Sequence, residues 1–270
     1  QLGTPFAVTE EGDAHPEFKR VLAEARDEDM VEFTSVAGLP ARAVATPQIR
    51  NQGTLGGNLS QDTRCWYYRS GWPCYRAGGN TCYASAPQAM SREHCILGAS
   101  RCVAVNPSDT APALIALDAK LVVRSRRRER TLDAEDYFVG PAIDITRMTV
   151  LKPNELLTAV QVSGDWAGAQ VYYQKVRDRA SWAFSLVTVA AAFRASGGRI
   201  EAARIAVNGV APYPVRLHDV ERAVAGSATG EETARAAGEL AVRGAKPLRH
   251  NEYKVALLRN LVRRAVRSVA

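Results

Sequence analysis

The chain has 270 residues, of which 46% are hydrophobic and 23% are charged, a balance typical of a globular protein. Its net charge of +7 comes from basic residues scattered among acidic ones, so the charge does not indicate a nucleic-acid partner. The sequence contains no apolar run of about eighteen residues, the length of a membrane-spanning helix, and no secretory signal.

The first 48 residues contain one helical pattern and no phosphate-binding pattern. Phe18, Val21 and Leu22 recur at helical spacing and predict a helix within residues 15–30. No Gly-rich loop follows a strand in this part of the chain. The sequence opens at Gln1 rather than Met, so we expect its natural start to lie upstream.

Residues 49–118 contain all five cysteines and two polar turn motifs. The motif TLGGN lies at 54–58 and the motif PSD at 107–109. Between them, glycine and proline favour turns and predict a long irregular loop. Such a loop buries too little apolar surface to offset its ordering entropy, so it needs an organiser, and a metal centre would supply one.

The spacing of the cysteines favours an iron–sulfur cluster. Four of them read C-x8-C-x7-C-x19-C, with Cys95 inside the last interval: Cys65, Cys74, Cys82 and Cys102. Thiolates without a matching histidine suit either zinc or a cubane cluster. A structural zinc site commonly uses a tight C-x2-4-C pair, which is missing here. Disulfides or inert buried thiols are the alternative, but an odd cysteine count and a large core make a disulfide scaffold unnecessary.

The second half of the chain predicts strands followed by helices. Apolar alternation and short apolar runs predict a helical turn leading into a strand over 112–125, and strands at 156–164, 172–176, 185–194 and 199–210. The basic run RSRRRER at 124–130 fits a solvated hairpin turn, because no aromatic residues lie among its arginines. Three helical patterns follow Pro214, with Gly226 and Gly244 placed as helix stops.

Five segments together carry a resemblance to a known family: TPQIRNQGTLGGN, the cysteine loop, NPSDTAPALIALDA, NELLTAV and YYQKVRDRASWAFSLVTVAAAF. They resemble the FAD-binding subunit of the molybdenum hydroxylases, from about residue 40 to the end. The long cysteine loop is similar to the branch with an inserted [4Fe-4S] cluster, as in 4-hydroxybenzoyl-CoA reductase and a periplasmic aldehyde oxidoreductase.

The resemblance implies an α+β fold in two parts rather than a single doubly wound Rossmann sheet. Residues 1–165 would form a partial PCMH-type FAD-binding region with a mixed sheet and an iron–sulfur loop at 62–105. Residues 166–270 would form a domain like the C-terminal domain of CO dehydrogenase flavoprotein, with a three-stranded sheet packed on helices.

The resemblance also implies the site residues. The FAD contacts would come from two turns and two later positions: Thr54, Leu55, Gly56, Gly57, Asn58, Ser108, Asp109, Leu156 and Lys175. The glycines would let the backbone approach a pyrophosphate, and Asp109 would accept hydrogen bonds from ribityl or ribose hydroxyls while Ser108 holds the turn. Leu156 and Lys175 would flank the isoalloxazine ring, with Lys175 offsetting charge on the reduced flavin. Their alternative interpretations are a core leucine and a solvated surface lysine.

We expect Cys65, Cys74, Cys82 and Cys102 to bind one [4Fe-4S] cluster. In the resembled loops the last ligand lies just before the Ser-Asp turn, which favours Cys102 over Cys95. Cys95 lies in a helix-like segment, SREHCILGAS, where a small buried thiol is an ordinary packing residue.

The implied function is electron transfer between partner subunits and an external acceptor. The partners would be a large subunit with a molybdenum cofactor and a small subunit with [2Fe-2S] clusters, in the cytoplasm or, through a partner's signal, the periplasm. This chain would hold no catalytic residue for substrate chemistry.

Two other functions stay open. The family's first FAD half, a GGGT-like phosphate loop, is not found, so we expect weak FAD binding by this chain alone, and a scaffold subunit that carries a cluster without FAD is the first alternative. A zinc-binding nucleic-acid protein is a remote second.

Overall fold

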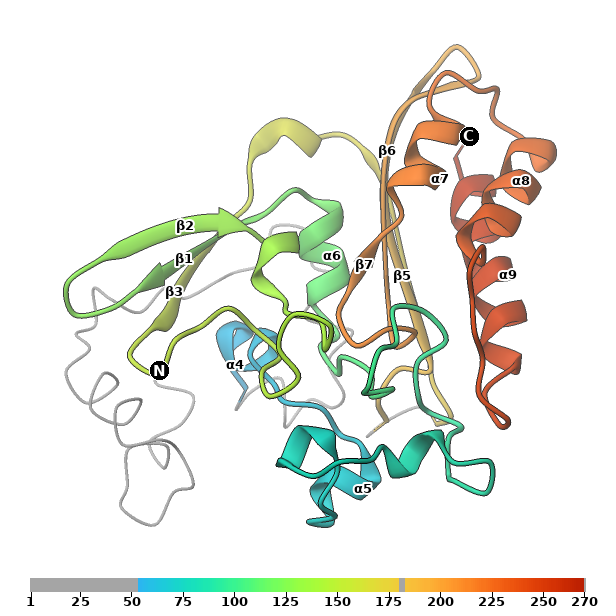
Figure 1. Ribbon diagram of the computed structural model, residues 1–270. Coiled ribbons are helices and arrows are strands. Elements are labelled where there is room, and N and C mark those ends of the chain that lie inside the picture. The colour runs from blue at the N-terminus through green and yellow to red at the C-terminus, as the bar shows by residue number, and fades with distance from the viewer. Residues whose placement is uncertain (1–52, 180–182, 270) are drawn as a thin grey trace.

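The computed structural model describes residues 53–179 and 183–269, which form an α+β chain with two antiparallel sheets (Figure 1). The helix predicted within residues 15–30 lies outside the described residues. In the described part, the expectation of two parts rather than one doubly wound parallel sheet is confirmed. No helix there has the length and apolar character needed to cross a membrane.

The first sheet is a three-stranded meander. Its strands are β1 (Lys120–Arg124), β2 (Glu129–Asp133) and β3 (Leu156–Gln161), in the order β2-β1-β3. The basic run forms the predicted hairpin turn, in which Ser125 N donates to Arg128 O at 2.7 Å. Both strand pairings are antiparallel, so the expected mixed sheet is not present among the described residues. A tight hairpin can join only antiparallel neighbours, which explains the β1–β2 pairing.

The second sheet has four strands rather than the three expected. They are β4 (Gln170–Val176), β5 (Val187–Ser196), β6 (Arg199–Asn208) and β7 (Val215–Arg216), in chain order and all antiparallel. The prediction missed β7 because two residues directly after Pro214 are too short to show alternation.

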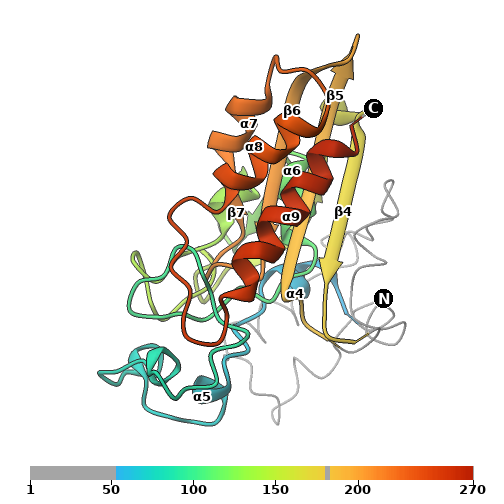
Figure 2. The ribbon, with the colours of Figure 1, turned by 90° about the vertical axis from the view of Figure 1, so that its right-hand side faces the viewer.

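Both faces of the second sheet are covered. Helices α7 (His218–Val224), α8 (Glu231–Ala241) and α9 (Tyr253–Arg267) lie on one face (Figure 2). The buried helix α6 (Ala111–Ala116) packs on the other face, where Ala190 and Ala206 belong to its core cluster. Alternate residues of β5, such as Val189 and Phe193, join the opposite cluster under the three helices. The two parts of the chain therefore share a core through α6.

The cysteine loop is irregular, as expected, apart from short helical turns. These are α5 (Trp66–Arg69) and the 3-10 turns η3 (Tyr75–Ala77) and η4 (Tyr83–Ser85). The helix-like prediction for residues 91–100 is wrong, because Cys95 N donates to Val103 O at 2.9 Å and Ile96 N to Val210 O at 2.8 Å. Ile96 packs in the core under the second sheet's helices, so tertiary contacts hold this segment in an irregular, non-helical form.

Two further 3-10 turns connect the elements: η5 (Glu135–Tyr137) follows β2 and η6 (Gly164–Trp166) precedes β4. A short helix, α4 (Leu55–Leu59), opens the described chain.

Candidate functional site

The TLGGN motif forms the start of α4 rather than the turn predicted for it. Thr54 is the N-cap, and its Oγ1 accepts a hydrogen bond from Gly57 N at 3.0 Å. A side chain at Gly56 would meet Leu157 O at 3.5 Å, so α4 lies against the start of β3. Gly57 is exposed, and the Thr54 side chain caps its N–H. The first N–H groups of a helix have no intrahelical acceptors and favour an anion.

Asn58 joins the two motifs directly. Its Oδ1 accepts hydrogen bonds from Ser108 Oγ at 2.8 Å, Thr110 Oγ1 at 2.7 Å and Thr110 N at 3.2 Å. Ser108 and Thr110 are buried. The end of α4 and the PSD turn are therefore one structural unit, which we call the Asn58 junction (Asn58, Ser108 and Thr110).

Two asparagines that the sequence interpretation missed shape the PSD turn. Asn106 Oδ1 accepts from Ser108 N at 2.9 Å, and Asn208 Nδ2 donates to Ser108 O at 2.6 Å. An asparagine two residues before a serine is an Asx-turn pattern, which could have identified Asn106. Nothing local identifies Asn208, because its contact crosses 100 positions of the chain.

Asp109 and Lys175 form a buried ion pair beside the Asn58 junction. Lys175 Nζ donates to Asp109 Oδ2 at 2.7 Å, and Tyr173 on the same strand donates to Asp109 O at 2.8 Å. Burial raises the pKa of Asp109 despite the opposing effect of Lys175. Asp109 Oδ1 is buried and has no hydrogen-bond partner in the described part of the chain. A buried carboxylate oxygen of this kind is suited to a hydroxyl donor from a ligand.

Leu156 lies at the first position of β3, paired with Arg124 of β1, and is half-buried. The contact with α4 is made by the next residue, Leu157, whose carbonyl would lie 3.5 Å from a Cβ at Gly56. The structure thus groups TLGGN with the PSD turn and Lys175, and it places Leu156 one residue before the contact between β3 and α4.

All five cysteines are free thiols, and three of them occupy the same kind of position relative to a short helical turn. Cys65, Cys74 and Cys82 are each the residue immediately before a short helical turn. Burial raises the pKa of Cys65, and Cys82 and Cys74 raise it further. Cys74 and Cys82 therefore both lie near Cys65.

The last two cysteines differ in their neighbours. Burial raises the pKa of Cys102 to about 11, with further contributions from Cys82 and Cys65. Cys95 is 1% exposed, and burial raises its pKa to about 12, with Cys102 and Cys82 contributing. Cys95 belongs to a buried cluster with Ala84 and Val103, and Cys65 and Cys82 pack against the same cluster.

No three His, Cys, Asp or Glu side chains in residues 53–179 and 183–269 are arranged to hold a single metal ion. A zinc ion draws its thiolates to about 2.3 Å each, whereas a cubane takes one thiolate at each of four separate irons. This finding therefore concerns a single ion.

His94 is a further residue that the sequence interpretation did not single out. Its Nε2 lies 3.3 Å from Cys65 Sγ, and its ring is buried. Burial lowers the pKa of His94 to about 4, with an added effect of Lys254, so the imidazole is neutral at pH 7. The contact links positions 29 apart, and no local pattern reveals it.

The start of α9 holds the segment that carries His94. Asn251 Nδ2 donates to His94 O at 2.9 Å and to Cys95 O at 3.1 Å. Lys254 Nζ donates to Glu93 O at 2.8 Å and to Gly209 O at 2.7 Å. Both side chains are fully buried, so the cysteine loop is anchored to the second part of the chain.

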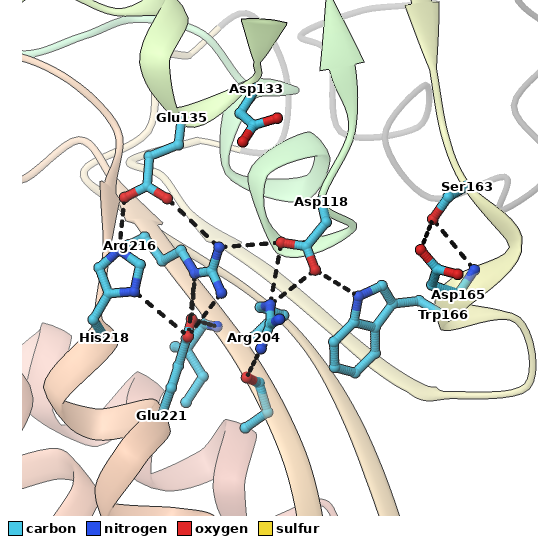
Figure 3. A network of polar contacts seen from close by, with 12 residues as sticks. Asp118, Asp133, Glu135, Ser163, Asp165, Trp166, Arg204, Arg216, His218 and Glu221 are labelled. Carbon is cyan, nitrogen blue, oxygen red and sulfur yellow. Dashed lines mark hydrogen bonds and ion pairs between the residues drawn. The ribbon is translucent and has the colours of Figure 1, made fainter.

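A polar cavity of about 220 Å³ lies elsewhere, between the α6–β1 corner and β6 and β7. Asp118 is its central residue: it accepts from Trp166 Nε1 at 2.9 Å, Arg204 Nε at 2.8 Å and Arg216 Nη1 at 3.1 Å (Figure 3). Arg216 also pairs with Glu221 at 2.9 Å. None of the residues predicted from the sequence lines this cavity, and its network ties the two parts of the chain together.

Two family models match the chain. The model of the FAD binding domain in molybdopterin dehydrogenase matches residues 18–162, and that of the CO dehydrogenase flavoprotein C-terminal domain matches residues 171–269. The matched ranges lie on either side of the predicted boundary at 165/166, which stays a prediction.

The chain is similar to subunits of known oxidoreductases. It is 36% identical over 219 residues to the aldehyde oxidoreductase FAD-binding subunit PaoB of Escherichia coli (strain K12), covering 80% of this chain and 65% of PaoB. It is 27% identical over 232 residues to the carbon monoxide dehydrogenase medium chain of Hydrogenophaga pseudoflava, covering 84% of this chain and 63% of that one. The chain thus spans just under two thirds of these relatives.

The solved structures agree in fold. A carbon monoxide dehydrogenase from Hydrogenophaga pseudoflava that lacks the Mo-pyranopterin moiety superposes with a TM-score of 0.59 at 25% identity. The match covers 83% of this chain and 63% of that one.

Proposed function

This chain belongs to the family of FAD binding domains in molybdopterin dehydrogenases, and from that premise we propose that it is the electron-transfer flavin subunit of a molybdenum-containing hydroxylase or dehydrogenase complex. The observation that carries the proposal is the buried Asp109 Oδ1, which lies beside the Asn58 junction without a partner in the described part of the chain. A ribityl or ribose hydroxyl of FAD would satisfy it. FAD would supply the redox chemistry, and the chain would bind and orient it.

The residues around Asp109 suit the remaining parts of the cofactor. The exposed backbone at Gly57 and the N-terminal end of α4, from Thr54 to Asn58, would face the pyrophosphate. Leu156, half-buried at the start of β3, would contact the isoalloxazine ring. Lys175 would offset negative charge on the reduced flavin, and because it is paired with Asp109 it would also hold that carboxylate in place.

We assign the thiols of Cys65, Cys74, Cys82 and Cys102 to one [4Fe-4S] cluster. The effects of Cys74 and Cys82 on the pKa of Cys65, and of Cys82 and Cys65 on that of Cys102, support the assignment, because only groups that lie close together influence one another in this way. Cys95 experiences similar effects from Cys102 and Cys82, but it would be spare because it is the most deeply buried of the five thiols. The chain would pass single electrons between this cluster and FAD.

The partner subunits would be a molybdenum-cofactor large subunit and a [2Fe-2S] small subunit, and nucleic acid would not be a partner. The names of the relatives support this, since they describe an FAD-binding subunit and a medium chain. We also propose that residues 1–165 and 166–270 are the flavin-binding and C-terminal domains.

The test is anaerobic purification of the full chain with its co-expressed partner subunits, followed by quantitation of flavin, iron and acid-labile sulfide. We expect flavin absorption bands together with a broad iron–sulfur shoulder. Asp109→Ala should lose flavin and retain iron, whereas the exposed Asp133→Asn should retain both. Iron and sulfide without flavin in the unmodified complex would favour the cluster-bearing scaffold, and zinc without iron would overturn the proposal.

A further inference from the structure

The imidazole of His94 is aimed at a thiol proposed as a cluster ligand. Its Nε2 lies 3.3 Å from Cys65 Sγ, and His94 is 3% exposed. In the described part of the chain, no other side-chain nitrogen has a recorded hydrogen bond to a cysteine sulfur.

The chemistry of the pair fixes the location of the ring proton. A thiolate is a hydrogen-bond acceptor and carries no proton, so a contact with Cys65 in that form requires a proton on Nε2. His94 Nδ1 is buried and has no partner in the described residues. With the proton on Nε2, Nδ1 carries only a lone pair, which is left without a partner. With the proton on Nδ1, an N–H group would be left without one, and buried N–H groups without a partner are rarer.

The position of the ring depends on the backbone rather than on the contact with sulfur. His94 N donates to Ser91 O at 3.1 Å, and Asn251 holds the carbonyl of His94. Lys254 fixes the preceding carbonyl, that of Glu93. A substitution of the imidazole therefore leaves the anchors of the segment in place.

We propose that His94 is a positioning residue that donates Nε2–H to the Cys65 thiolate and so raises the reduction potential of the cluster. The inference rests on the proposed function, because it requires the cluster on Cys65. When the cluster accepts one electron from its donor, its negative charge increases and no bond or proton need be exchanged. A hydrogen bond to a ligand sulfur stabilises the more negative, reduced form.

The test compares three variants in the full complex: His94→Phe removes the donor, His94→Gln keeps an N–H, and Ser91→Ala is the control. Ser91 is buried three residues away, and its Oγ has no partner in the described residues. Iron and sulfide content and the midpoint potential, from a redox titration monitored by EPR, are measured for each. We expect His94→Phe to shift the potential to a more negative value, His94→Gln to recover part of the shift, and Ser91→Ala to leave it unchanged.

A second measurement uses the unmodified protein labelled with ¹⁵N-histidine. The chain has only four histidines, so a ¹⁵N coupling in the pulsed EPR spectrum of the reduced cluster, absent from the spectrum of His94→Gln, identifies His94. This measurement decides the question if the Phe variant fails to retain iron.

The outcomes separate the two proposals. A normal iron content in His94→Phe with an unchanged potential, or an absent ¹⁵N coupling, overturns the role of His94 and leaves the proposed function standing. An unmodified complex without iron and sulfide overturns the proposed function itself.

Discussion

Lys175 Nζ and Asp109 Oδ2 lie 2.7 Å apart although the two residues are 66 positions apart in the chain, and their side chains are only 5% and 8% exposed. The pair joins β4 of the second sheet to the PSD turn of the first part. The geometry of the proposed flavin site therefore depends on how the two parts pack.

Removing one partner of this pair should be strongly destabilising. Lys175→Met leaves the carboxylate of Asp109 buried beside an apolar side chain, and the loss of one partner from a buried pair costs about 3–5 kcal/mol. Urea denaturation of the isolated chain measures the free energy of unfolding. The double variant Lys175→Met/Asp109→Leu should lose less than the two single variants added together. Additive losses would show that the pair is not coupled.

The Asn58 junction predicts a graded loss of stability. Asn58→Ala removes the acceptor of three hydrogen bonds and leaves the buried groups of Ser108 and Thr110 without it, so we expect a loss of about 2–4 kcal/mol. Thr110→Val removes only one side-chain donor and should cost about 1 kcal/mol. Thermal and urea unfolding rank the two variants, and an equal loss would contradict the shared-acceptor geometry.

Gly79 should be required for the cysteine loop for a steric reason. A Cβ at this position would lie 1.7 Å from Pro73 O, which no rotation of a side chain can relieve. Gly79→Ala should therefore displace the turn that begins at Cys74 and lower the iron content of the complex. Gly71→Ala is the control: Gly71 has a φ of +79° but open space around it, so its variant should cost only about 1 kcal/mol and retain iron.

The five cysteines should separate into ligands and a spare. Cys102→Ala should abolish the cluster or convert it to one with fewer irons, whereas Cys95→Ala should leave the iron and sulfide content intact. Cys95 fills an apolar cluster, so its variant should still lose about 1 kcal/mol of stability. The reverse pattern of iron loss would identify Cys95 as the fourth ligand.

Lys254 predicts a dependence of stability on pH. Burial lowers its pKa from 10.5 to about 7, Arg92 lowers it slightly, and Cys95 and Glu93 oppose the shift. Between pH 7 and 10.5, Lys254 carries a proton in the unfolded chain that it has released in the folded chain. The free energy of unfolding should therefore rise with pH by up to about 1.4 kcal/mol per pH unit.

Lys254→Met should remove the rise of stability with pH between pH 7 and 8.5. This window lies above the pKa of His94 and below the usual pKa of a thiol, so His94 and the cysteines titrate mainly outside it. The measurement is urea unfolding at several pH values. Loss of the hydrogen bonds to Glu93 and Gly209 lowers stability at every pH and does not change the slope. Parallel pH profiles of the variant and the unmodified chain would contradict the prediction.

The sequence was sufficient where local patterns decide the structure. The long strands β4, β5 and β6 and the three final helices follow from apolar spacing, and Gly226 and Gly244 adopt φ values of +77° and +79° beyond the ends of α7 and α8. Local patterns failed where a distant contact decides. The segment around Ile96 looks helical in isolation, but hydrogen bonds with Val103 and Val210 hold it in an irregular form.

The candidate site shows the same division. The two flavin motifs and the cysteines are visible as turn residues and thiols, and Asn106 carries a local turn signal. Asn208, Lys254 and His94 act through partners more than 25 positions away, so the sequence around each of them contains no sign of its contact. Tertiary packing, not residue type, gives these side chains their roles.

The Asn58 junction has a consequence for how the chain can change over evolution. The hydrogen bond from Ser108 to Asn58 closes 50 positions of chain into a loop whose two ends meet. Because the entropy of loop closure changes by only about 0.6 kcal/mol for each doubling of length, the segment between these residues can be lengthened at small cost in closure entropy. Shortening it past Ile96 would in addition remove a residue from the core under the helices of the second sheet. The turns that meet at the Asn58 junction therefore constrain the length of the cysteine-bearing segment only weakly, whereas its packing constrains it strongly.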